Sequence, residues 1–232
     1  MIITEKITAF YGQNGSGKTS ILKKISTDED MFYSTADQDW FRGIYNKYNL
    51  IIESYSIENI ADKLNTFLPF LDSEIVYVNY VDNELLFTHT GGIEHTDGWR
   101  IVHALTYREE SDGIKKLVYL LPMIINAIQE DKLLFIDGIE TFLNPNIVKL
   151  IIELFKKSKT GKLIFSSNDT NTMLQLKHKN IKLVKRVFDE IIIQDIPTDC
   201  TVKKFKKDFD NGEYGCQPII QDEAFFYKIF NK

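Results

Sequence analysis

Short apolar runs and longer amphipathic stripes alternate along most of this chain. The runs that predict buried strands are residues 7–11, 133–136, 163–165 and 191–193. They lack the apolar–polar alternation of a half-exposed strand, as expected for parallel strands covered on both faces. Apolar positions three and four residues apart predict helices over residues 19–25, 57–71, 111–129 and 145–156. Strands that alternate with helices favour a mainly parallel α/β sheet flanked by helices.

Turn and cap residues add detail to these elements. Asn144 followed by Pro145 predicts a helix N-terminus, because asparagine caps free N–H groups and proline fits the first turn. Pro122 lies inside a predicted helix and is expected to bend it, because its ring removes a backbone hydrogen bond. Weaker patterns predict a strand at residues 50–52 and a short helix at residues 171–176.

An antiparallel unit is predicted after the second predicted helix. Residues 75–81 and 84–88 are strand-like runs separated by the turn-forming pair Asp82-Asn83, which predicts a β-hairpin. We therefore expect an antiparallel β lobe beside the parallel sheet. No linker or repeat divides the chain, so we expect one domain over residues 1–232, in which 1–130 and 131–232 are two halves of the same unit.

Composition and charge exclude some classes of protein. The net charge of −5 disfavours a protein that binds bare nucleic-acid backbone, although a local basic patch stays open. The basic runs around residues 177–186 and 203–207 are interpreted as solvated faces. No apolar run is long enough to span a membrane, the first residues lack a signal-peptide pattern, and the two cysteines are not spaced for a metal. A cytoplasmic protein is expected.

A glycine-rich loop provides the strongest functional signal. Gly12-Gln13-Asn14-Gly15-Ser16-Gly17-Lys18-Thr19 is an intact Walker A motif between a predicted strand and a predicted helix. Its backbone N–H groups and the helix N-terminus form a phosphate site. Lys18 is expected to reach the β- and γ-phosphates, and the Thr19 hydroxyl to hold Mg²⁺. The alternative is a glycine-rich turn that binds nothing, which the two flanks disfavour.

The Walker A loop changes the interpretation of two further segments. Asp137 ends the apolar run 133–136, where a Walker B aspartate would hold Mg²⁺ beside Thr19. Ser111-Asp112-Gly113 opens the long helix that precedes it. In isolation these are a turn residue and a plain N-cap. In this order they favour a magnesium ligand and a signature element of the ABC type.

Five segments in order resemble the ABC-type AAA ATPases of the OLD-like group, which are relatives of the SMC and RecF heads. They are the Walker A loop, residues 110–122, residues 135–145, residues 163–168 and the tail 209–218. The resemblance implies a P-loop NTPase fold of the ABC-ATPase type and the cofactors ATP and Mg²⁺. It also implies composite ATP sites, in which the signature of one subunit faces the nucleotide of a second copy or an ATPase-family partner.

The resemblance, together with the motifs, assigns the following site residues. Nucleotide-binding residues are Asn14, Gly15, Ser16, Gly17, Lys18, Thr19 and Ser20, with Ser111, Asp112 and Gly113 acting toward the partner's nucleotide. The metal ligands are Thr19 and Asp137, and the catalytic candidates are Lys18, Glu140 and Asn168. Gln38 is a candidate for the Q-loop residue of the family.

The chain departs from the family pattern where hydrolysis is concerned. Gly138 stands where the family usually has a glutamate that polarises the attacking water, and Asn168 stands where a switch histidine is expected. These departures imply that the chain binds ATP but hydrolyses it slowly. Glu140 is interpreted equally well as a substitute base or as a dimer-contact residue. The loop also begins at residue 12, so the strands that usually precede it are expected to be largely absent.

Three functions follow from these observations. The favoured one is an ATP-dependent switch, slow in hydrolysis, that controls a separate effector such as a nuclease or toxin, as in bacterial or phage defence. The alternative is a DNA-repair or chromosome-organising head that clamps nucleic acid, which the charge and the short interval before Ser111 disfavour. A small-molecule kinase is least favoured, because no lid-like cluster is formed in the sequence by Arg42, Arg100, Arg108 and Arg186.

Overall fold

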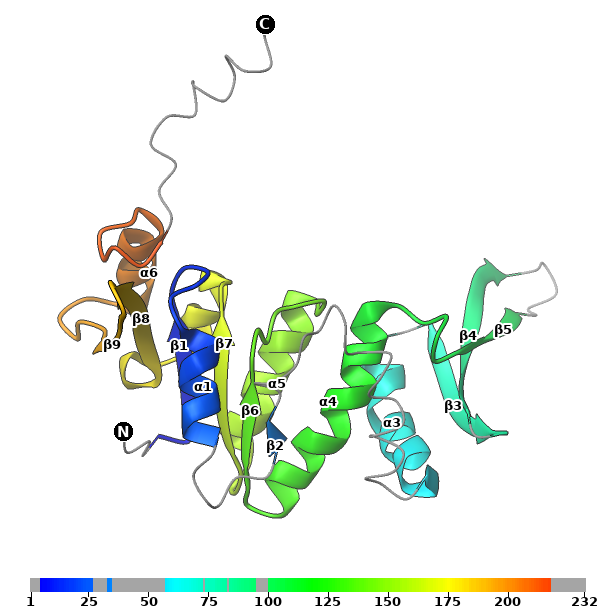
Figure 1. Cartoon of the computed structure of the whole chain (residues 1–232). Helices are drawn as coiled ribbons and strands as arrows, with labels where there is room; N and C mark the ends of the chain where they lie inside the picture. The colour runs from blue at the N-terminus through cyan, green and yellow to red at the C-terminus, as the bar shows by residue number, and fades with distance from the viewer. Residues whose placement is uncertain are drawn as a thin grey trace, which may run out of the picture.

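Two β-sheets organise the chain, joined by helices that lie between them (Figure 1). The computed structural model describes residues 5–26, 33–34, 57–72, 74–82, 84–94 and 100–217. The larger sheet has the strand order β2-β6-β7-β1-β8-β9. Its strands are β1 (Ile7–Tyr11), β2 (Tyr33–Ser34), β6 (Leu133–Ile136), β7 (Lys162–Ser167), β8 (Ile181–Val187) and β9 (Glu190–Asp195). Strands β2, β6, β7, β1 and β8 are mutually parallel, and β9 runs antiparallel to β8.

The apolar runs form the centre of this sheet, as expected. All five residues of β1 are buried, and β1 pairs with β7 and β8 on its two sides. On one face Phe10 packs in a cluster with Ile21 and Leu22 of α1 (Lys18–Ser26). On the other face Ala9 and its neighbours join the main core with the apolar stripe of α5 (Pro145–Lys157). Coverage on both faces explains why apolar residues predominate in these strands.

The helices begin near the residues that the sequence marks. They are α1, α3 (Ile57–Leu71), α4 (Asp112–Gln129), α5 and α6 (Val202–Asp210), with the short 3₁₀ helices η1 (Thr170–Gln175) and η2 (His178–Asn180). Ser111 is the N-cap of α4, and Asn144 caps α5 by accepting a hydrogen bond from the Asn146 N–H at 2.9 Å. Helix α4 continues through Pro122, and its bend stays a prediction.

The smaller sheet is antiparallel and has the order β3-β4-β5. Its strands are β3 (Ile75–Val81), β4 (Glu84–Glu94) and β5 (Arg100–Thr106). The expected hairpin is confirmed, with Asp82 in the turn at a φ of 50°. The expectation of two strands was incomplete, because β4 runs on to Glu94 and pairs with β5. The exposed side chains of Val102, His103 and Ala104 explain why β5 shows no alternating pattern.

Helices α3 and α4 connect the two sheets (Figure 1). Ile60, Leu64 and Leu68 of α3 are buried in the main core together with residues of β3, β4 and α4. Asn65 fixes the helix to β3, because its side chain both donates to and accepts from the backbone of Val78 at 2.8 and 2.6 Å. The antiparallel sheet is therefore packed onto α3, which in turn contacts α4, the helix whose N-terminus carries Ser111.

The C-terminal part differs most from the sequence-based expectation. Residues 191–193 were expected to continue the parallel pattern, but they belong to β9, which forms an antiparallel hairpin with β8. Strand β8 and helix α6 were not predicted, because lysine and arginine residues interrupt their apolar positions. Gln38, the predicted strand 50–52 and the end of the tail at Pro218 lie outside the described residues. Within the described part of the chain, no helix is long and apolar enough to cross a membrane.

Candidate functional site

The Walker A loop connects β1 to α1, which confirms the strand–loop–helix order. Gly15 and Gly17 have φ values of +79° and +100°, in the left-handed region that glycine adopts without strain. The Ser16 N–H donates to the Gln13 carbonyl at 3.1 Å and closes the turn. Helix α1 starts at Lys18, so its free N–H groups face the loop. The backbone therefore has the form of an anion-binding nest.

Lys18 is folded back inside this loop. Its side chain is 8% exposed, and Nζ donates to the carbonyl oxygens of Gly12 at 2.6 Å and Gln13 at 3.1 Å. Burial lowers the pKa of Lys18, and the nearby carboxylates of Asp137 and Glu140 oppose that shift. The Lys18 side chain is thus held inside the loop by two backbone carbonyl groups.

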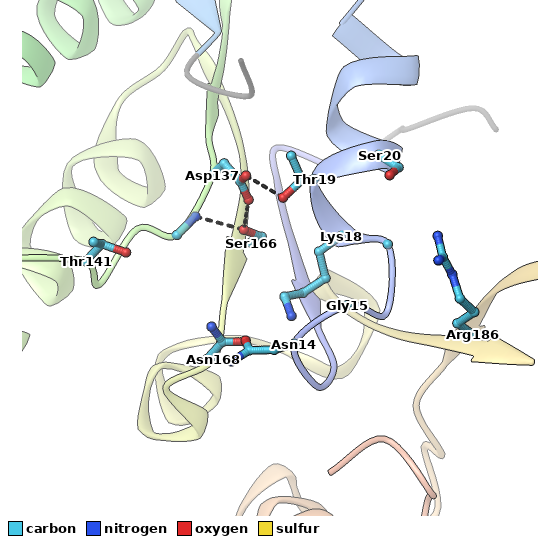
Figure 2. A pocket seen from close by; sticks show the side chains of 12 residues that line it. Asn14, Gly15, Lys18, Thr19, Ser20, Asp137, Thr141, Ser166, Asn168 and Arg186 are labelled. Carbon is cyan, nitrogen blue, oxygen red and sulfur yellow. Dashed lines mark hydrogen bonds between the residues drawn. The ribbon is translucent and has the colours of Figure 1, made fainter. Parts of the chain in front are cut away.

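A chain of three side chains joins the Walker A loop to two strand ends (Figure 2). The Thr19 hydroxyl donates to Asp137 Oδ2 at 2.6 Å, and the Ser166 hydroxyl donates to Asp137 Oδ1. Ser166 Oγ also accepts a hydrogen bond from the Gly138 N–H at 2.8 Å. Both oxygens of the Asp137 carboxylate are therefore fixed, one by the loop and one by Ser166.

The strand order explains this arrangement. Strand β7 lies between β1 and β6, so Ser166, next to its C-terminal end, falls between the Walker A loop and Asp137. The carboxyl ends of parallel strands share one edge of the sheet, where open α/β folds bind their ligands. The prediction that Asp137 follows a buried strand and faces Thr19 is confirmed.

A pocket of about 410 Å³ opens at this edge of the sheet. The residues that line it are Asn14, Gly15, Gly17, Lys18, Thr19, Ser20, Asp137, Gly138, Thr141, Ser166, Asn168 and Arg186. Most of the expected nucleotide-binding residues are therefore brought together. Ser16 is fully buried beneath the loop and does not line the pocket.

The oxygen ligands at this pocket fit a magnesium ion shared with phosphate. Thr19 Oγ1 and Asp137 Oδ2 are already 2.6 Å apart and are hard oxygen donors. Among the described residues no group of three His, Cys, Asp or Glu side chains could hold a metal by itself. Mg²⁺ usually binds one or two protein oxygens and takes its other ligands from water and substrate phosphates. The donor set matches that mode.

Of the two positions that depart from the family pattern, Gly138 directly follows Asp137 and Asn168 lines the same pocket. Gly138 has a φ of +59°, and a Cβ built there would lie 2.7 Å from Thr141 Oγ1. Glycine at this position therefore has a structural reason, because any side chain would be strained. Asn168 is exposed and lines the pocket.

Glu140 lies close to the pocket without lining it. Its Oε1 accepts a hydrogen bond from the Asn168 N–H at 2.7 Å, and its Oε2 is buried with no partner among the described residues. The carboxylate thus connects the loop after β6 to the loop after β7. Its role as a base stays a prediction.

Ser111, Asp112 and Gly113 do not line the pocket formed by the same chain. Ser111 and Asp112 are exposed, and Ser111 Oγ accepts from the Ile114 N–H at 3.2 Å as an N-cap. A Cβ on Gly113 would lie 2.9 Å from the Phe142 carbonyl oxygen, so only glycine allows α4 to approach the loop after β6 this closely.

Lys116 strengthens the same contact from one turn further along α4. Its side chain is fully buried, and Nζ donates to the carbonyl oxygens of Gly138, Ile139 and Thr141 at 2.7, 3.2 and 2.8 Å. Burial lowers the pKa of Lys116 to about 7, against the opposing effect of Glu140 and Asp137. The loop that follows Asp137 is thereby held on the helix that carries Ser111.

Sequence reasoning missed four residues of this region: Ser166, Thr141, Arg186 and Lys116. Ser166 lay within a segment quoted for the family resemblance, but no pattern singled out its hydroxyl. Arg186 belonged to a basic run interpreted as a solvated face, and only the pairing of β8 with β1 brings it to the pocket. Lys116 lies on another face of α4 than the predicted apolar stripe, so the pattern did not mark it as buried.

One family model matches part of the chain. Residues 76–173 match the family described as "AAA domain, putative AbiEii toxin, Type IV TA system". The matched segment is fewer than half of the 232 residues. It runs from β3 into η1, so it includes α4 and Asp137 but not the Walker A loop. No curated protein matches the chain.

Solved structures with a similar arrangement include two SMC heads. The SMC head domain from Thermotoga maritima is 14% identical with a TM-score of 0.41, covering 66% of this chain and 52% of that chain. The SMC head bound to the C-winged helix domain of ScpA is 15% identical with a TM-score of 0.41, covering 85% and 57%. This chain therefore spans little more than half the length of either protein.

Proposed function

We propose that this chain is an ATP-binding ABC-type ATPase that acts as a nucleotide switch. The observation that carries the proposal is the hydrogen-bonded chain Thr19–Asp137–Ser166 beside Lys18, at the mouth of a loop with nest geometry. The family match adds support, because its description names an AAA domain. The oxygen ligands, the lysine and the backbone nest together suit a triphosphate with magnesium better than any other common ligand.

In the proposed site each residue has a separate role. Backbone N–H groups of the loop hold phosphate oxygens, and Lys18 leaves its carbonyl partners to contact the β- and γ-phosphates. Thr19 and Asp137 would hold Mg²⁺, which neutralises charge on those phosphates. Ser166 orients Asp137 by hydrogen bonding, and Asn168 donates toward the terminal phosphate from the far side of the pocket.

Hydrolysis is proposed to be slow. The position that follows Asp137 is a glycine in the left-handed region, and Asn168 cannot carry a proton away from water. Glu140 is hydrogen-bonded to the Asn168 backbone and is the remaining acidic candidate. Because general-base catalysis is worth about a hundredfold to ten-thousandfold, its weakening would leave ATP bound for long periods. Such a protein would behave as a latch.

The signature element supports ATP-dependent association. Ser111 and Asp112 are exposed at the N-terminus of α4, away from the pocket of their own chain. A helix N-terminus of this kind attracts phosphate oxygens. We therefore propose composite sites in which Ser111 faces the nucleotide of a second copy or of an ATPase-family partner, with two-fold symmetry when the partner is identical.

A separate effector would be the target of this switch. The family description mentions a putative toxin of a type IV toxin–antitoxin system, which supports a role in bacterial or phage conflict. The proposed partner is a nuclease or toxin on another chain. A DNA-clamping function stays the alternative, and it would be recognised by ATP-dependent binding to duplex DNA.

The test measures mass and phosphate release together. Light scattering with and without ATP and Mg²⁺ should show a larger species only with nucleotide, while phosphate release stays slow. The matched control is Lys18→Ala, which should abolish the nucleotide effect. An unchanged mass, or a mass that rises without nucleotide, would contradict the proposed assembly. Duplex DNA in the same experiment identifies the alternative if only DNA plus ATP gives a complex.

A further inference from the structure

The β8–β9 hairpin lies directly against the Walker A loop. A Cβ built on Gly12 would lie 2.1 Å from the Val184 carbonyl oxygen in β8. A Cβ built on Gly17 would lie 2.5 Å from Ile191 Cδ1 in β9. Both ends of the loop therefore contact this hairpin. A Cβ at Gly12 would clash with backbone, and one at Gly17 would require the end of the Ile191 side chain to move. The hairpin is part of the wall of the pocket.

Strand pairing fixes one basic side chain at this wall. Arg186 of β8 is directly opposite Ile191 of β9, and side chains of directly opposed residues point to the same face of an antiparallel pair. Since Ile191 packs on Gly17, Arg186 is directed to the same side, and it lines the pocket. Figure 2 shows its guanidinium beside the start of α1, across the Walker A loop from Asp137.

The guanidinium of Arg186 has no hydrogen bond or ion pair among the described residues. Its strand neighbour Lys182, by contrast, is bonded to the Asp195 carboxylate. Lys18 and Arg186 are the basic side chains that line the pocket. An unpaired arginine at a phosphate pocket can form charge-assisted, bidentate hydrogen bonds with an anion.

The direction of a bound triphosphate determines which phosphate Arg186 would meet. The proposed Mg²⁺ would be held where Thr19 meets Asp137, so the β- and γ-phosphates would belong at that side, together with Lys18. The nucleotide must then continue along the loop toward Ser20 and Arg186, which line the opposite part of the pocket. The α-phosphate is the one group that neither the metal nor Lys18 neutralises.

We infer that Arg186 binds the α-phosphate of the nucleotide and thereby links the β8–β9 hairpin to the bound nucleotide. The inference rests on the proposed nucleotide-binding function and adds a residue from the C-terminal part of the chain to it. Arg186 acts as a binding residue in this role. Because the α-phosphate is common to all nucleoside triphosphates, the contact strengthens binding without selecting a base.

The test measures dissociation constants of ATP, GTP and UTP for the wild type and for Arg186→Ala in the presence of Mg²⁺. A charge-assisted contact predicts weakening of about tenfold to a hundredfold. The factor should be the same for the three nucleotides, since they share the α-phosphate. Arg186→Lys should recover part of the loss. Lys185→Ala, which removes a neighbouring charge that does not line the pocket, should bind like the wild type.

The possible outcomes distinguish failure of the α-phosphate contact from failure of the proposed nucleotide binding. Wild-type protein that binds no nucleotide overturns the proposed function. Wild-type protein that binds ATP, together with unchanged affinity in Arg186→Ala, overturns only the inference about Arg186. A loss confined to one base overturns the α-phosphate contact in favour of a base contact. An equal loss in Lys185→Ala overturns the direct contact in favour of a general charge effect.

Discussion

Lys116 Nζ donates to the Gly138 carbonyl oxygen at 2.7 Å, although no part of the lysine side chain reaches solvent. The hydrogen bond joins the first turns of α4, which begins beside Ser111, to the residue that follows Asp137. A shift of α4 would therefore be transmitted to the loop beside the proposed metal site. Lys116 thus connects the Ser111 end of α4 to the loop that follows Asp137.

Replacing Lys116 by methionine should destabilise the fold. The substitution removes the group that donates to backbone carbonyls of the loop after β6, and a buried acceptor left unpaired costs about 1–3 kcal/mol. We expect the free energy of unfolding, measured by urea denaturation at pH 8, to fall by that amount. Lys149→Met, at an exposed position of α5, should change it by less than about 0.5 kcal/mol. Equal stability of the two variants would contradict the structural role of Lys116.

Stability should also depend on pH through Lys116. Its pKa is about 7 in the folded chain, lowered by burial from 10.5, despite the carboxylates of Glu140 and Asp137. Between these values the unfolded chain binds the proton and the folded chain does not, so folding becomes more favourable as pH rises. The difference in unfolding free energy between wild type and Lys116→Met should grow from pH 7 to pH 10. A constant difference would show that Lys116 stays charged when buried.

The elements that the sequence predicted correctly share one physical property. Strands β1, β6 and β7 are covered on both faces, so apolar residues predominate in them and the pattern is visible without knowing the partners. The caps Ser111 and Asn144 act through hydrogen bonds to residues two or three positions away, so a local pattern reveals them as well. The resulting α/β architecture, with a parallel sheet and an antiparallel lobe, is confirmed.

The missed parts depend on contacts between distant segments. Ser166 and Arg186 reach the pocket because β7 and β8 pair with β1 on opposite sides, which no local pattern reveals. Strand β5 has an exposed face and gave no alternation. The roles proposed for Ser111 and Glu140 depend on a second chain or on a bound nucleotide, so both stay predictions.

Replacing Ser111 by arginine should impair ATP-dependent assembly. A long charged side chain at the N-terminus of α4 would block approach to the partner's phosphates. We expect at least a tenfold higher protein concentration to be needed for association, measured by light scattering with ATP and Mg²⁺. Ser111→Thr keeps both the hydroxyl and the N-cap and should assemble normally.

Loss of the cap provides the control for folding in this experiment. Ser111→Ala removes the hydrogen bond to the Ile114 N–H and should cost about 1 kcal/mol of stability without adding bulk. If Ser111→Arg assembles as well as wild type, the signature interpretation is wrong. If Ser111→Ala fails as completely as the arginine variant, the hydroxyl itself makes the essential contact.

Glu140→Gln should change ATP hydrolysis by less than about threefold if the protein is a latch. Glutamine keeps an acceptor for the Asn168 N–H, so the loop geometry survives the substitution. Loss of a true general base would instead lower the rate by about a hundredfold or more. The measurement is single-turnover phosphate release with protein in excess of ATP. A fast wild-type rate abolished by Glu140→Gln would assign the base to Glu140.

Gly138→Glu is a poorer test of the same question. A side chain there must adopt a φ of +59° and would meet Thr141 Oγ1 at 2.7 Å. The variant would therefore combine strain with any gain of a base. Gly138→Ala measures the strain alone, and we expect it to be destabilised by about 1 kcal/mol relative to wild type.

Calorimetric titration of ATP with Mg²⁺ into wild type, Lys18→Ala and Lys23→Ala is the most direct test of the central claim. Lys23 lies on the same helix as Lys18, is exposed and does not line the pocket, so it controls for loss of charge alone. We expect wild type and Lys23→Ala to bind with equal affinity and Lys18→Ala to bind at least a hundredfold more weakly. Equal affinity of all three proteins, or no binding to wild type, would contradict nucleotide binding at this loop.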